Sequence, residues 1–116
     1  MPITTDGGTA AQQQDVSNAA NNVIANLGQI TNDELRDCIR NKANNGTVEI
    51  EECDDAALLG WNTWIAVFGF KLWASGTIHV CINNHGNNAQ LLRDTLMHEW
   101  AHSCCWDHGD GQGVPA

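Results

Sequence analysis

The stretch from residue 89 to residue 103 constrains this chain most, because it predicts a helix with almost no exposed face. Beyond Arg93 and Asp94, few of its positions are suited to solvent. A helix that is apolar nearly all round is a buried one. We therefore expect this helix to lie at the centre of the core. Its apolar side chains are Leu91, Leu92, Leu96, Met97, Trp100 and Ala101.

The same helix carries three ionisable side chains, His98, Glu99 and His102. Burying unpaired ionisable groups is costly, so their presence needs a chemical reason. Residues four apart on a helix share one face, so both imidazoles can point at a single metal ion. Glu99 follows the first imidazole directly and can reach a water molecule at that metal and take its proton. The spacing predicts a zinc site with Glu99 as the general base.

A third zinc ligand is expected, because catalytic zinc usually has three protein ligands and a water. His108 follows His102 by six residues and is the preferred candidate. On a continuous helix it would point away from the first two ligands, so the helix must end before it. Residues 107–111 are suited to such a turn. Asp107 and Asp110 stay open as alternatives, although zinc prefers an imidazole to a single carboxylate.

Residues 98–108 resemble the extended zinc signature H-E-x-x-H-x-x-G-x-x-H of the metzincin branch of the zincin metallopeptidases. The match lies at His98, Glu99, His102 and His108, whereas Cys105 stands at the position of the Gly. Residues 109–116 also contain no Met for the Met-turn of that branch, so the chain resembles a minimal or divergent member. The resemblance implies a zinc-dependent metalloendopeptidase, a hydrolase in which Zn²⁺ polarises the scissile carbonyl of a peptide or protein substrate. Glu99 would pass the proton of the attacking water to the leaving amine.

The order of the predicted elements also resembles the N-terminal subdomain of zincins. The fold class expected is α+β, with a flexible lead-in over residues 1–8 and a single catalytic domain spanning residues 1–116. Apolar periodicity predicts two helices and alternation predicts strands. The helices are expected at about 10–27 and, after a capping box at Thr31 and Glu34, at 31–45. Strands are expected at 47–51, once or twice within 56–75, and at 77–83 before the buried helix.

The resemblance implies three further roles around the zinc. Residues 77–83 would be the edge strand of a small mixed sheet, lining the cleft and pairing with an extended peptide. The oxyanion would be stabilised by the metal alone, by His79 or by His85. Asp94, one turn before His98, would accept a hydrogen bond from a ligand imidazole.

Two non-catalytic readings stay open. In the first, Cys104, Cys105 or both complete a closed structural zinc site with His98 and His102, and Glu99 is incidental. In the second, the chain is an inactive zincin-fold binding protein.

The cysteine content favours an oxidising compartment, because five Cys in 116 residues are many for a reducing one. Cys38 and Cys53 could form one disulfide, and Cys81 with Cys104 or Cys105 a second; fully reduced thiols stay open. The first residues contain no basic and apolar leader. We therefore expect a secreted protein, or a piece of a larger exported one, with a cytoplasmic location as the alternative.

The charge balance excludes several partners. The net charge is −9, with 5 Lys and Arg against 14 Asp and Glu, which argues against nucleic acid and against anionic membranes. No apolar run approaches the ~20 residues of a membrane span. The acidic residues 49, 51, 52, 54 and 55 are expected to form a solvated edge, and His79 to be structural or solvated if it has no catalytic role.

Overall fold

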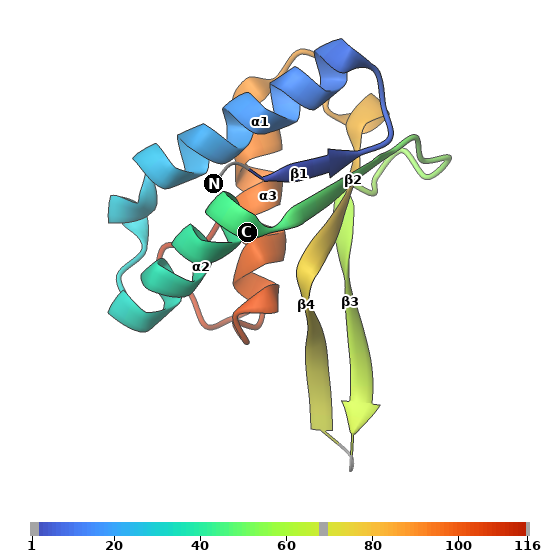
Figure 1. Cartoon of the computed structure of the whole chain (residues 1–116). Helices are drawn as coiled ribbons and strands as arrows, with labels where there is room; N and C mark the ends of the chain where they lie inside the picture. Colours follow the sequence, from blue (N-terminus) through green and yellow to red (C-terminus); the bar gives the residue numbers. More distant parts are fainter. Residues whose placement is uncertain (1–2, 68–69, 116) are drawn as a thin grey trace.

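The computed structural model describes residues 3–67 and 70–115, with the side chains of these residues apart from 63–67 and 70–76. Helices and a small mixed sheet make up the chain, which confirms the α+β class (Figure 1). In chain order the elements are β1 (Thr4–Asp6), α1 (Ala10–Ala25), the 3-10 helix η1 (Leu27–Gln29), α2 (Asp33–Asn45), β2 (Thr47–Glu51), β3 (Gly60–Val67), β4 (Phe70–Cys81), the 3-10 helix η2 (Ile82–Asn84) and α3 (Ala89–Ser103).

The strands lie in the order β1-β2-β4-β3. β1, β2 and β4 are parallel, and β3 is antiparallel to β4. The predicted edge position of residues 77–83 is therefore wrong, because β4 is paired on both sides and β3 forms that edge of the sheet. The predicted strand also ends early, since residues 82–84 form η2.

The helices lie on one face of the sheet, as Figure 1 shows. Val48, Ile50, Ile78 and Val80 point towards the helices and are buried. The residues between them in β2 and β4 are half-buried and lie on the opposite face. This alternation is the expected pattern for a sheet with one covered face.

α3 occupies the centre of the core, as its sequence predicts. It packs against α1, α2, β3 and β4, and Asn88 begins it by accepting a hydrogen bond from the Leu91 backbone N–H at 2.9 Å. Trp100 is 0% exposed. The residues of α3 that are buried are Leu92, Thr95, Leu96, Met97, Glu99, Trp100, Ala101 and His102.

The N-terminal part differs from the prediction in two places. Residues 4–6 are not part of a flexible lead-in, because they form β1 and pair in parallel with β2. The second helix begins one residue after Asn32 rather than at Thr31, since the Asn32 side chain accepts the Leu35 N–H at 2.9 Å.

Two disulfides join elements that are far apart in the sequence, Cys38–Cys104 and Cys53–Cys81. Cys105 is a free, exposed thiol. The predicted pairings of Cys38 with Cys53, and of Cys81 with Cys104 or Cys105, are therefore wrong. Cys38 lies on α2, which packs against α3, and the end of β4 lies beside the segment that follows β2. The two bridges fit an extracellular location.

No helix in the described part of the chain is long and apolar enough to cross a membrane.

His85 joins η2 to α3 and is buried. Its Nδ1 lies 2.9 Å from the Cys81 carbonyl oxygen, and its Nε2 lies 2.9 Å from the Thr95 hydroxyl. Burial lowers the pKa of His85, against a smaller opposing effect of the Cys81 carbonyl. The neutral imidazole is therefore the form that the folded protein favours.

We expect the His85→Gln variant to lose less stability in mild acid than the wild type. Because the folded pKa lies below the ordinary value of about 6.5, the neutral ring stabilises the fold above that pH. This stabilisation is lost as the pH falls from about 6.5 towards the folded pKa, because the unfolded chain takes up the proton first. By pH ~5 the loss through one histidine cannot exceed about 2 kcal/mol. Urea unfolding of the metal-free proteins at pH ~7 and ~5 checks this. An equal fall in the free energy of unfolding for the wild type and His85→Gln would contradict it.

Candidate metal centre

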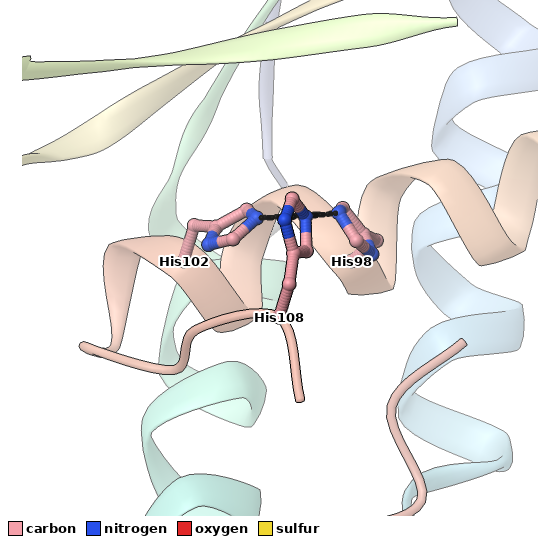
Figure 2. Close-up of side chains that lie close together, drawn as sticks. All are labelled: His98, His102 and His108. Atoms are coloured by element: carbon pink, nitrogen blue, oxygen red, sulfur yellow. Dashed lines mark hydrogen bonds between the residues drawn. The ribbon is translucent and has the colours of Figure 1, made fainter. Parts of the chain in front are cut away.

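The imidazoles of His98, His102 and His108 converge on one point beside α3 (Figure 2). Their Nε2 atoms are 3.0 Å apart between His98 and His108, 3.1 Å between His102 and His108, and 3.2 Å between His98 and His102. The first two come from the helix and the third from the loop after it. The structure thus brings together the three histidines that the sequence singled out.

The hydrogen bonds at Nδ1 of His98 and His102 determine whether the converging Nε2 atoms carry a proton. His98 donates from Nδ1 to the Pro115 carbonyl oxygen at 2.8 Å, and His102 donates from Nδ1 to the Trp106 carbonyl oxygen at 2.8 Å. A carbonyl oxygen can only accept, so the ring proton of each neutral imidazole lies on Nδ1. Burial lowers the pKa of both rings, which favours the neutral form. Two lone pairs therefore face one another, an arrangement that a cation between them would stabilise.

The triangle of nitrogens fits a transition-metal ion. With Zn–N bonds of about 2.0–2.1 Å, two corners of a tetrahedron lie about 3.3–3.4 Å apart. The observed separations of 3.0–3.2 Å are close to this value. Carbonyl acceptors on the outer nitrogens are the usual partners of ligating histidines. Imidazole donors suit zinc, copper, iron and nickel, so the residues can hold a metal of this class.

The chain reaches the third histidine through a tight helix end. The Trp106 N–H donates to the Ala101 carbonyl at 3.0 Å, and the Cys105 N–H donates to the His102 carbonyl at 3.0 Å. Cys105 has a φ of 69°, the left-handed conformation in which glycine is usual. The prediction that the helix ends before His108 is confirmed.

The loop after the helix is held by its own polar groups. Asp110 Oδ2 accepts the Asp107 N–H at 2.9 Å, and the Trp106 indole N–H donates to the Gly111 carbonyl at 3.1 Å. The indole ring lies beside the histidines, 5.2 Å from the rings of His98 and His102. Neither aspartate belongs to the converging group. Among the described residues, His108 is thus better placed as third ligand than either alternative.

A segment near the C-terminus orients His98. The Gln29 amide donates to the Gly113 carbonyl at 2.8 Å, and the Thr31 N–H donates to the Gln112 carbonyl at 2.9 Å. These bonds hold the segment that carries the Pro115 carbonyl. Sequence analysis missed this contact, because a backbone acceptor has no side-chain signature.

Glu99 lies next to the histidines and is 8% exposed. Burial raises its pKa to about 7. A general base works best when its pKa lies near the working pH. Glu99 and His98 share a cavity of about 90 Å³ between α3 and the start of β3. The other residues that line this cavity are Leu59, Gly60, Leu91, Asp94 and Thr95.

β3 is fastened to the helix at Glu99. The buried Asn62 side chain donates from Nδ2 to the Glu99 backbone carbonyl at 2.8 Å and to the Ser103 hydroxyl at 2.6 Å. Gly60 permits the close approach of β3 to both β4 and α3, since a Cβ there would lie 2.5 Å from the His79 carbonyl oxygen and 3.1 Å from Thr95 Cγ2. Sequence analysis did not single out Asn62. Its only signal was a polar residue between aromatic ones in a predicted strand.

Several predicted roles do not fit the geometry. The Asp94 carboxylate pairs with Arg93 at 2.8 Å, and His98 donates to Pro115, so the predicted acceptor role of Asp94 is wrong. His79 contacts residues on the outer face of the sheet, and His85 is buried against Cys81 and Thr95, so neither supports the oxyanion role.

The alternative of a closed structural zinc site, completed by Cys104 or Cys105, lacks one of its sulfur donors. The Cys104 sulfur is bonded to Cys38 and provides no thiolate. Cys105 is exposed and does not belong to the converging group.

No protein-family model, curated protein or solved structure matches the chain.

We expect His108→Ala to weaken zinc binding by more than ~100-fold, because it removes a direct ligand, whereas loss of an outer partner costs 10- to 100-fold. Asp107→Asn is the matched control, since it changes the neighbouring side chain without removing an imidazole. Competition with a chromophoric chelator measures both affinities. An Asp107→Asn variant that binds zinc as weakly as His108→Ala would contradict the assignment.

We expect Cys105→Gly to stabilise the protein by up to about 1 kcal/mol, because glycine adopts the left-handed conformation without a Cβ penalty. Cys105→Ala removes the same thiol but keeps the Cβ, so it should give no gain. Thermal unfolding under non-reducing conditions compares the two variants. Equal stabilities would show that the helix end carries no strain.

Proposed function

We propose that the protein is a zinc-dependent metalloendopeptidase that hydrolyses peptide bonds, with His98, His102 and His108 as zinc ligands and Glu99 as general base. The observation that carries the proposal is the buried Glu99 carboxylate, which shares a cavity with a ligand histidine. A purely structural zinc site has no need of a buried carboxylate at that position. The spacing of the four residues, which resembles that of the metzincins, supports the same reading.

The bound zinc ion would supply Lewis acidity, polarising a carbonyl oxygen and making water a stronger nucleophile at neutral pH. The side chains of the protein provide the remaining steps. Glu99, with a pKa raised to about 7, accepts the proton of the attacking water and donates it to the leaving amine. The Nδ1 bonds of His98 and His102 place the ring proton on Nδ1 and orient both rings, while burial lowers the pKa of each ring and favours the neutral form.

The edge strand offers a binding surface for an extended substrate. In the described part of the sheet, β3 pairs only with β4, so the other side of its backbone is open. β3 begins at Gly60, which lines the cavity beside Glu99. An extended peptide that adds to β3 would pass this cavity. The role assigned to residues 77–83 from the sequence thus belongs to β3 in the proposed mechanism.

The expected substrate is a peptide or protein outside the cell. The net charge of −9 disfavours polyanions such as nucleic acid. The two disulfides fit secretion, or release from a larger exported protein.

We expect Glu99→Gln to lower peptide cleavage by ~10²- to 10⁴-fold while zinc stays bound, because the amide cannot accept the proton. A quenched-fluorescence peptide library measures cleavage, and metal analysis of the same samples measures zinc. Glu52→Gln removes one negative charge at an exposed position and serves as the control. Cleavage that survives Glu99→Gln would rule out the general-base role.

A wild type that binds zinc tightly but cleaves no peptide in the library would instead favour the alternative, a non-catalytic zinc module or an inactive zincin-fold binding protein. The same measurement thus separates the two functions.

A further inference from the structure

A second group of metal-binding side chains lies on the outer face of the sheet. Glu49 and Glu51 project from β2, and His79 projects from β4. The His79 Nδ1 is 3.0 Å from Glu49 Oε2 and 3.3 Å from Glu51 Oε1, and one donor atom from each residue lies within 4.8 Å of the others. We propose that this group is a second metal site, which binds a divalent transition-metal ion such as Zn²⁺.

The convergence of the two carboxylates supports a cation. Glu49 and Glu51 are two residues apart on one face of β2, where like charges repel. Both nevertheless approach the same nitrogen of one imidazole. A neutral ring carries at most one hydrogen at that nitrogen, so it cannot donate a good hydrogen bond to both. Among the side chains that the structure describes, no Lys or Arg forms an ion pair with either glutamate.

The backbone beneath the group is rigid. The Cys53–Cys81 disulfide lies two residues after Glu51 and two after His79, and it ties the β2 end to the β4 end. The Asn83 side chain reinforces this link, accepting the Cys53 N–H at 2.9 Å and donating to the Cys53 carbonyl at 3.0 Å. A metal site needs ligands that are held in place before the ion arrives.

Trp61 of β3 fixes the orientation of the imidazole. Its ring is stacked on His79 with centroids 4.5 Å apart and planes 2° from parallel. The stack covers one face of the imidazole, so its edge is directed to the carboxylates. An ion bound there would join β2 to β4 and, through Trp61, would steady the edge strand β3.

The donor set indicates the class of metal. One imidazole nitrogen with two carboxylate oxygens suits zinc and its neighbours in the first transition row. Magnesium and calcium prefer oxygen ligands alone and should bind less well. The side chains lie on the face of the sheet opposite the helices, so the second site is separate from the histidines of α3. It does not depend on the proposed peptidase activity.

Calorimetric titration of the disulfide-bonded protein with Zn²⁺ tests the proposal. A Cys105→Ser background excludes binding at the exposed thiol. We expect about two ions per chain in two affinity classes. Glu51→Gln and Glu49→Gln should each lower the zinc affinity of the weaker class at least ~10-fold. Each removes a direct carboxylate ligand, which should cost no less than the loss of an outer partner. Glu52→Gln removes the same charge but no donor, so both classes should persist.

The His102→Ala variant separates this site from the first one. It should lose the tight class of Zn²⁺ binding and keep the weaker class. In its NMR spectrum, added Zn²⁺ should shift the His79 ring resonances. Titration curves of Glu49→Gln and Glu51→Gln that superimpose on that of Glu52→Gln would overturn the proposal. So would His79 resonances that respond to pH but not to Zn²⁺, which would indicate an imidazolium held between two carboxylates. Mg²⁺ in place of Zn²⁺ should leave these resonances unchanged.

Discussion

The burial of α3 is the constraint on which the rest of the structure depends. The helix contacts both other α-helices and two strands, and its apolar residues supply much of the core. A helix in this position can expose polar groups only where its neighbours leave a gap. Such a gap lies beside His98 and Glu99, so one proposed metal ligand and the proposed base share a small cavity. Packing that stabilises the fold thereby also removes water from the Glu99 carboxylate, which raises its pKa.

The end of α3 brings a third imidazole, that of His108, to this buried face. Cys105 adopts a left-handed conformation, which reverses the chain. The Trp106 carbonyl oxygen then accepts a hydrogen bond from His102 Nδ1, and the indole ring packs beside the histidines. The disulfide between Cys38 and Cys104 fixes this reversal to α2. His108, the proposed third ligand, is exposed. It nevertheless lies on a loop whose start is fixed by the disulfide and whose path is held by hydrogen bonds.

The sequence predicts what local patterns control. The bounds of α3, the pairing of His98 with His102, and the turn before His108 all follow from spacing within a few residues. The pairing of segments that are distant in the chain could not be predicted from the sequence. The place of β4 inside the sheet and the partners of Cys38 and Cys81 depend on which elements pack together, and chain spacing carries no such information. The same limit hid the group at His79, because the strand register that sets Glu49 opposite His79 cannot be deduced from either strand alone.

The contact between η1 and the segment around Gly113 has a consequence for how this protein can vary. A Cβ at Gly113 would collide with the Gln29 carbonyl oxygen, and the bonds from Gln29 and Thr31 direct the Pro115 carbonyl towards His98. A change in the connection between the first two helices would therefore be transmitted to His98, one of the proposed metal ligands. Position 113 should therefore accept glycine alone, because the atom that a Cβ would meet is the backbone oxygen of Gln29, which no substitution at position 29 removes.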